Sequence, residues 1–203
     1  YDVKTIISKV KPYSSSFTFG HSRLITNGLG DNQPVVRDDV IVIHNGIIVN
    51  DDVIWDDLEI KRLFKIDSEI IAAITTQHLK AGKDLSLLSD AVLGQCKGTI
   101  STAIVLPKLG KVVLLSNNGS LYIGTNVEEF YFSSESYPLM QLGCEDIEQV
   151  KEHAHIVDIP LCEDIKMTDD KKRTEDLIPV FKYITNEAEL LEYKKPLLKR
   201  CTK

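Results

Sequence analysis

The chain has 203 residues, 43% of them hydrophobic, and a formal net charge of −6. That length suits one large domain or two small ones with a sizeable core. The charge is spread along the sequence without a basic stripe, so the pattern excludes nucleic acid as an expected partner. No apolar run approaches the roughly 20 residues that cross a bilayer, and the first residues do not form a signal peptide. We therefore expect a cytoplasmic protein without a membrane partner.

Cysteine and histidine spacing argues against a metal site. The four cysteines, Cys96, Cys144, Cys162 and Cys201, are widely separated and form no Cys-x-x-Cys pair. The five histidines have no zinc-ligand spacing, and disulfide frameworks occur mainly in smaller chains with denser cysteines. The sequence predicts reduced structural thiols, no metal and no cofactor in this domain.

The first third of the chain predicts two strands around turn-rich segments. Residues 17–23 are typical of a strand, and residues 28–34 are dense in turn residues. Residues 40–43 form a β-branched run that predicts a buried strand, resuming at residues 47–49 after His44-Asn45-Gly46. Because Asn-Gly adopts positive φ at low cost, we expect a strand break and a sharp reversal that turns an amide N–H toward a ligand.

Helical spacing of apolar residues then predicts three helices, over residues 52–64, 67–80 and 86–95. Asp67 and Ser68 lie where an N-cap would lie, so one interpretation of Asp67 is a helix cap.

The second half of the chain predicts mostly strands. Expected elements are a hairpin of residues 99–106 and 111–115, short strands at 121–123, 129–132 and 156–159, and a helix start at 133–136. This order favours an α+β fold with a sheet-on-sheet core covered by helices. Residues 168–175 indicate a polar linker, followed by a helix with a capping box at Asn186 and Glu189. We therefore divide the chain into a domain over residues 1–167 and a linker with a C-terminal helix over residues 168–203.

Three short strings carry groups complementary to one small amide. Arg23 can bind a carboxylate through two parallel hydrogen bonds, and Asp67 can balance an ammonium. Asn45 and Gly46 can donate to a carbonyl oxygen that becomes negative during acyl transfer. Glutamine is a substrate that carries all three groups.

The same strings, in order, resemble motifs of the class II glutamine amidotransferases, whose glutaminase domains are N-terminal nucleophile hydrolases. The matching strings are Gly20-His21-Ser22-Arg23 with Thr26 and Gly28, Asn32-Gln33-Pro34, His44-Asn45-Gly46-Ile47-Ile48 and Asp67-Ser68-Glu69-Ile70-Ile71-Ala72. The likeness covers about residues 17–142. It implies a four-layer αββα sandwich with the substrate pocket at one end of the paired sheets.

The resemblance also implies a role for each site residue. Arg23 would hold the glutamine α-carboxylate, Asp67 the α-ammonium, and Thr26 with Asn27 would line the same pocket. The Asn45 side-chain amide and the Gly46 backbone N–H would form the oxyanion hole.

The resembled family begins with Cys-Gly-Ile at its mature N-terminus, and the α-amine of that cysteine serves as the base. His21 and His44 are therefore expected to be structural. This chain begins at Tyr1 and none of its cysteines has a free α-amine, so we expect the nucleophile segment to be missing and the chain alone to be inactive. Omission of a leading segment is the favoured explanation. The alternative is a nucleophile-less module that binds an amino acid or acts as a scaffold.

Two further likenesses concern the wider protein. Residues 45–48 and 66–70 resemble the glutaminase half of glucosamine-6-phosphate synthase, whereas residues 196–203 resemble the lead-in to the synthetase domain of asparagine-synthetase-like amidotransferases. The implied partners are L-glutamine and a synthetase or transferase domain in the same polypeptide, with a sugar as one candidate ammonia acceptor. A homo-oligomer is left open.

Overall fold

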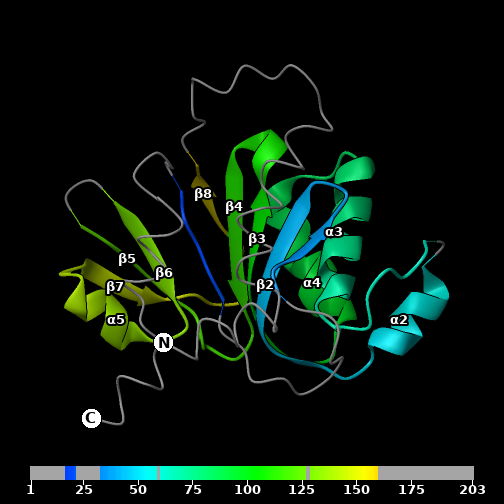
Figure 1. The fold of residues 1–203 in the computed structure, drawn as a ribbon, viewed down its shortest axis with the longest axis horizontal. Helices are drawn as coiled ribbons and strands as arrows, with labels where there is room; N and C mark the ends of the chain where they lie inside the picture. The colour runs from blue at the N-terminus through cyan, green and yellow to red at the C-terminus, as the bar shows by residue number, and fades with distance from the viewer. Residues whose placement is uncertain (1–16, 22–32, 59, 127–128, 160–203) are drawn as a thin grey trace, which may run out of the picture. The chain divides into compact units, whose positions relative to one another are not determined.

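The computed structural model describes residues 17–21, 33–58, 60–126 and 129–159 (Figure 1). All the helices and strands described lie in one compact unit, residues 24–158. Residues 17–21 carry no regular structure, so the strand predicted over residues 17–23 is wrong for its described part. The predicted linker, the helix after residue 186 and the boundary at residue 167 lie outside the described residues.

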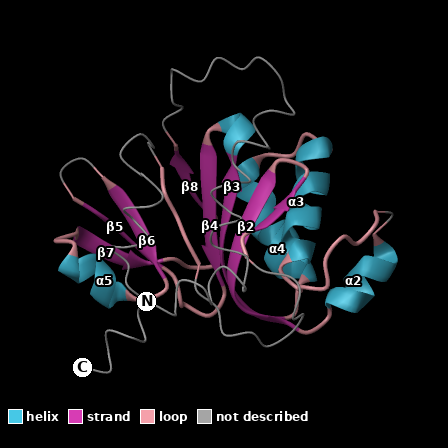
Figure 2. Cartoon of the chain, viewed as in Figure 1, coloured by secondary structure: helices cyan, strands magenta, loops and turns pink. Residues whose placement is uncertain are grey.

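The described strands form two antiparallel sheets (Figure 2). The first has five strands in the order β1-β2-β3-β4-β8, and the second has three in the order β6-β5-β7. The strands are β1 (Val35–Arg37), β2 (Val40–Ile48), β3 (Gly98–Leu106), β4 (Lys111–Ser116), β5 (Tyr122–Thr125), β6 (Phe130–Ser133), β7 (Glu145–Gln149) and β8 (His155–Asp158). The predicted hairpin is confirmed as β3 and β4, and the predicted antiparallel α+β class is confirmed at this level. The four-layer sandwich stays a prediction.

Helices cover one face of the five-stranded sheet, where α3 and α4 lie against β2 and β3 (Figure 1). The helical elements are α2 (Asp51–Asp57), α3 (Glu69–Lys80), η2 (Leu85–Leu87), α4 (Leu88–Gln95), η3 (Pro107–Leu109) and α5 (Ser136–Gln141). They fall short of the length and hydropathy that a membrane-spanning helix needs.

The core between helices and sheet follows from two periodicities. Ile70, Ile71 and Ile74 of α3 belong to the same buried cluster as alternate residues of β3, among them Ile100 and Ile104, and all five are almost fully buried. Burying one such side chain contributes about 1.5–3 kcal/mol. The intervening β3 residues are buried as well, so neither face of this strand is solvated at its centre.

Two predicted boundaries are wrong. The helix expected over residues 52–64 ends at Asp57, where Leu58 turns to an extended conformation. Further along, the N–H groups of Leu63 and Phe64 donate to the Glu69 carboxylate instead of to helical carbonyl oxygens. The strand break expected at His44–Gly46 does not occur, because β2 runs through these residues in register with β3.

Candidate functional site

Asn45 and Gly46 lie within the stretch of β2 that pairs with β3, opposite Ser101 and Ile100 respectively. Both are exposed. Gly46 has φ of 148°, and a Cβ placed on it would stand 1.9 Å from the Thr99 carbonyl oxygen. Only glycine fits this combination of backbone angle and close approach. The predicted turn is therefore replaced by a strand whose glycine permits contact with its neighbour.

The other edge of β2 at His44 is filled by a side chain. The His44 N–H donates to Gln33 Oε1 at 2.5 Å, and Gln33 Nε2 donates to the His44 carbonyl oxygen at 2.9 Å. An antiparallel strand would make the same pair of bonds. In the register between β1 and β2, β1 pairs with residues 40–42 only, so Gln33 continues the edge where β1 has ended.

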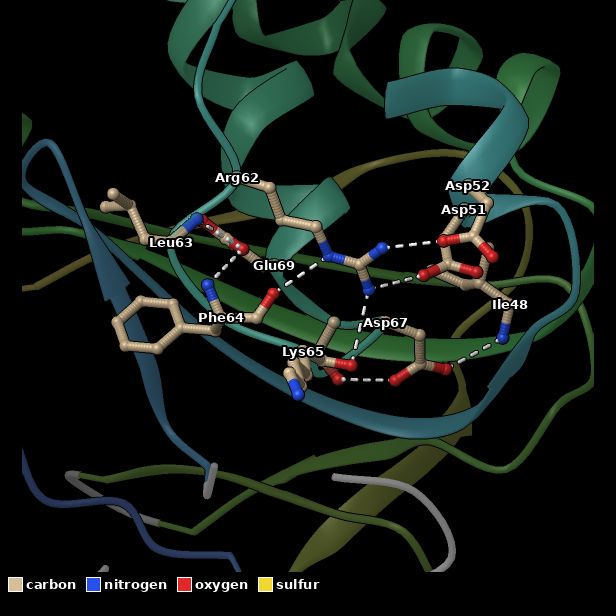
Figure 3. Close-up of polar contacts among 10 residues, drawn as sticks. Ile48, Asp51, Asp52, Arg62, Leu63, Phe64, Lys65, Asp67 and Glu69 are labelled. Carbon is tan, nitrogen blue, oxygen red and sulfur yellow. Dashed lines mark hydrogen bonds and ion pairs between the residues drawn. The ribbon is translucent and has the colours of Figure 1, made fainter. Parts of the chain in front are cut away.

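Asp67 fills the same edge four residues further along. The Ile48 N–H donates to Asp67 Oδ2 at 2.9 Å, as Figure 3 shows. Backbone groups of alternate residues point to the same side of a strand, so we expect the Gly46 N–H to face the edge between Gln33 and Asp67. The structure thus bonds the predicted ammonium-binding carboxylate to the strand that carries Asn45 and Gly46.

The helix-cap interpretation of Asp67 is wrong for its side chain. The N-cap of α3 is Ser68, which makes no side-chain cap hydrogen bond. The Asp67 carboxylate accepts instead from Ile48 N and, at 3.3 Å, from the Ser68 hydroxyl. Its position is therefore set by β2 as well as by the start of α3.

His44 is buried between α3 and β3. Its Nδ1 lies 3.2 Å from Ser68 Oγ, and its Nε2 lies 3.2 Å from the Thr99 carbonyl oxygen. Burial lowers the pKa of His44, although Asp67 and the Thr99 carbonyl act in the opposite direction. A neutral ring with the proton on Nε2 satisfies Thr99, which fits the structural role expected for His44.

Cys96 lies near the carboxylates of Asp51 and Asp67 but is unsuited to nucleophilic attack. Burial, followed by the two negative charges, raises the pKa of its thiol to about 12. The thiolate is the reactive form of cysteine, so Cys96 is inert at neutral pH. The other described cysteine, Cys144, is half-buried.

Three charged side chains near Asp67 were not predicted as part of the site. Glu69 is fully buried, forms an ion pair with Arg37, and accepts hydrogen bonds from Leu63 N and Phe64 N. Arg62 bonds both α2 and the segment before Asp67 (Figure 3). A glutamate in the first turn of a helix is a common sequence feature, so only the three-dimensional contacts distinguish Glu69. Arg23, Thr26 and Asn27 lie outside the described residues.

Comparisons with known proteins show which family the sequence resembles. A family model described as a glutamine amidotransferase domain matches residues 21–141. The glutamine–fructose-6-phosphate aminotransferase (isomerizing) of Zymomonas mobilis is 29% identical over 138 residues, covering 64% of this chain and 23% of that protein. Its Escherichia coli counterpart is 26% identical over 136 residues, with 64% and 22% covered. The chain therefore spans less than a quarter of these relatives.

A solved structure supports the fold. The glutamine phosphoribosylpyrophosphate amidotransferase from B. subtilis, complexed with ADP and GMP, aligns with a TM-score of 0.52 and 19% identity, covering 70% of this chain and 34% of that one. The likeness is one of fold, with antiparallel sheets and helices on one face. Because the family model matches more than half of the 203 residues, the chain belongs to the glutamine amidotransferase domain family.

Proposed function

We propose that the chain is the glutaminase part of a glutamine amidotransferase, which hydrolyses glutamine to glutamate and delivers ammonia to an acceptor in a second domain. The observation that carries this proposal is the bond from Ile48 N to Asp67 Oδ2. It holds at β2 the carboxylate that would balance the ammonium, two residues along the strand from Gly46, the proposed oxyanion donor.

In this mechanism each site residue binds one part of glutamine. Arg23 takes the α-carboxylate through two parallel hydrogen bonds, Asp67 takes the α-ammonium, and Thr26 with Asn27 line the pocket. The Asn45 side-chain amide and the Gly46 N–H stabilise the oxyanion that forms on the amide oxygen. The loss of one such donor typically costs about 10²–10³ in rate.

The attacking group in the proposal is the thiol of an N-terminal cysteine, as the class II resemblance implies. Its α-amine accepts the thiol proton, and the thiolate adds to the amide carbon. The protonated α-amine gives this proton to the amide nitrogen, which leaves the tetrahedral intermediate as ammonia and a thioester remains. Water then hydrolyses the thioester to glutamate and restores the thiol. Cys96 cannot take this role, since its thiol stays protonated. The reaction as proposed uses no metal or cofactor in this domain.

The acceptor is proposed from the relatives. Those reported are named aminotransferases of fructose-6-phosphate, so a sugar phosphate site in a transferase domain of the same polypeptide is a reasonable destination for the ammonia. A cytoplasmic location and an αββα sandwich are parts of the same proposal.

The test measures glutamate released from glutamine by the full-length gene product. Asn45→Ala is expected to lower kcat about 10²-fold or more, and Arg23→Ala to raise KM steeply. Asn126→Ala, outside the site, serves as the matched control and should change neither constant. Glutamine binding by calorimetry without any glutamate release would contradict the proposal and favour an amino-acid-binding module.

A further inference from the structure

Arg62 holds the segment of residues 63–67, which carries Asp67, through hydrogen bonds to its backbone. The Arg62 guanidinium donates to Asp51 Oδ2 at 2.8 Å and to Asp52 Oδ1 at 2.7 Å, both in α2. It also donates from Nε to the Phe64 carbonyl oxygen at 2.8 Å and from Nη2 to the Lys65 carbonyl oxygen at 3.3 Å. The Arg62 side chain therefore connects α2 to Phe64 and Lys65, which precede Asp67 in the sequence (Figure 3).

These contacts form a closed path that begins and ends at Ile48 of β2. Strand β2 ends at Ile48, and α2 begins three residues later at Asp51. Arg62 crosses from Asp51 to Lys65, and Asp67 returns to Ile48 N. The Asp67 carboxylate is thus bonded directly to β2, the strand that carries Asn45 and Gly46. The segment before Asp67 is also connected to α2, which follows β2, through Arg62.

Glu69 holds the same segment independently of Arg62. Glu69 accepts from Leu63 N at 2.9 Å and from Phe64 N at 2.8 Å, and it forms an ion pair with Arg37. Glu69 is fully buried, whereas the Arg62 side chain is 29% exposed. Arg62 is therefore more accessible than Glu69, although its guanidinium lies over the Trp55 ring of the core.

The Arg62 guanidinium also lies over the ring of Trp55. Its Cζ lies 5.8 Å from the centroid of the Trp55 ring, within the range of a cation–π contact. Arginine offers donors in a fixed planar fork, which suits acceptors on α2 and on the segment at the same time, and a lysine ammonium cannot reproduce this pattern.

We propose that Arg62 is a positioning residue that sets the affinity for the substrate α-ammonium by fixing the place of Asp67 relative to Asn45 and Gly46. This inference rests on the proposed function. Arg62 does not touch glutamine in this proposal. It removes freedom from the Asp67 segment before binding, so less ordering is needed when the ammonium arrives.

The experiment compares Arg62→Ala and Arg62→Lys with wild type in the full-length gene product. We expect KM for glutamine to rise about five-fold or more in both variants, with kcat within about two-fold, because an interaction of ground state and transition state alike is weakened. Lys111→Ala, which breaks an exposed ion pair with Asp158 at another edge of the sheet, is the matched control and should leave both constants unchanged.

A second readout separates positioning from general loosening. Competitive inhibition by glutamate and by glutarate, which lacks the α-ammonium, is measured in each variant. Arg62→Ala should weaken inhibition by glutamate about five-fold or more while leaving glutarate nearly unchanged. Equal weakening of both inhibitors would overturn the inference.

A variant that fails to fold, a failure of the proposed function and a failure of this inference give different results. If Arg62→Ala fails to fold, Asp52→Asn removes one charged partner of Arg62 at a residue whose side chain is 88% exposed, and it should change the glutamate-to-glutarate ratio in the same direction by about two-fold. No glutamate release by wild type would defeat the proposed function. An active wild type with an unchanged ratio in every folded variant would overturn this inference alone.

Discussion

The carbonyl oxygen of Thr99 lies 1.9 Å from the point at which a Cβ on Gly46 would stand. The Ile47 carbonyl oxygen bears the same relation to Gly98, at 2.0 Å. Two glycines thus let β2 and β3 approach where the proposed oxyanion donors lie. Any side chain at either position would push the strands apart.

Gly46→Ala should abolish most activity and lower stability. The added methyl meets the Thr99 backbone, and alanine at φ of 148° is strained by about 1–3 kcal/mol. We expect a fall of about 10²-fold or more in kcat for glutamate release, measured beside chemical denaturation.

Gly94→Ala is the matched control for this change. Gly94 lies in α4, with nothing within 4 Å of its Cβ position. Alanine there should raise the free energy of unfolding by about 0.5–1 kcal/mol and leave kcat unchanged. A large loss of activity in this variant would mean that glycine replacement acts through something other than the β2–β3 contact.

Glu69→Gln should destabilise the protein strongly. The change removes the buried carboxylate paired with Arg37 and leaves Arg37 with the exposed and more distant Asp38, 3.8 Å away. The loss of one partner of a buried ion pair typically costs about 3–5 kcal/mol. Urea denaturation of Glu69→Gln, Arg37→Met and the double variant measures the coupling. Purely additive losses would contradict a direct interaction between the two side chains.

Stability should decrease as the pH falls below about 6.5, the unperturbed pKa of histidine. Burial lowers the folded-state pKa of His44, so the unfolded chain binds a proton at a pH where the folded protein does not. The contribution is complete above the unfolded pKa and is lost as the pH falls toward the folded one. In thermal denaturation from pH 7.5 to 5, His44→Gln should show a smaller decrease than wild type, whereas the exposed His153→Gln should not.

Cys96 should resist alkylation in the folded protein. With a pKa of about 12, only about 10⁻⁴ of its thiol is ionised at pH 8. The half-buried Cys144 should react with iodoacetamide at least about 100-fold faster. Peptide mass spectrometry after timed quenching measures both rates, and rapid labelling of Cys96 in native buffer would disprove the burial.

Local sequence signals were sufficient for the elements whose stability is local or repetitive. The β-branched run of β3 and the apolar spacing of α3 predicted both elements within a few residues. By contrast, β7 has the sequence Glu145-Asp146-Ile147-Glu148-Gln149, which is acidic and largely exposed, so no hydrophobic alternation announced it. Its pairing with β5 depends on a partner distant in sequence.

The candidate site residues were predicted one by one, but the contacts that hold them in place were not. Asn45, Gly46 and Asp67 were predicted from their chemistry, and in the structure the Asp67 carboxylate accepts a hydrogen bond from Ile48 N, on the strand that carries the other two. Arg62 could not be found, because its four acceptors come from two separated segments and its sequence neighbours suggested a helix. Tertiary contacts decided that segment, and local spacing does not contain them.

The carboxamide of Gln33 has one more consequence, which concerns selectivity among ligands by size. An exposed strand edge is a template on which an extended polypeptide can add as a further strand. On β2 the groups that such a guest would require at His44 and Ile48 already bond Gln33 and Asp67. Among the described residues, a single position, Gly46, lies between them on this edge. Under the proposed function, we therefore expect the edge to bind a free amino acid in preference to an extended peptide.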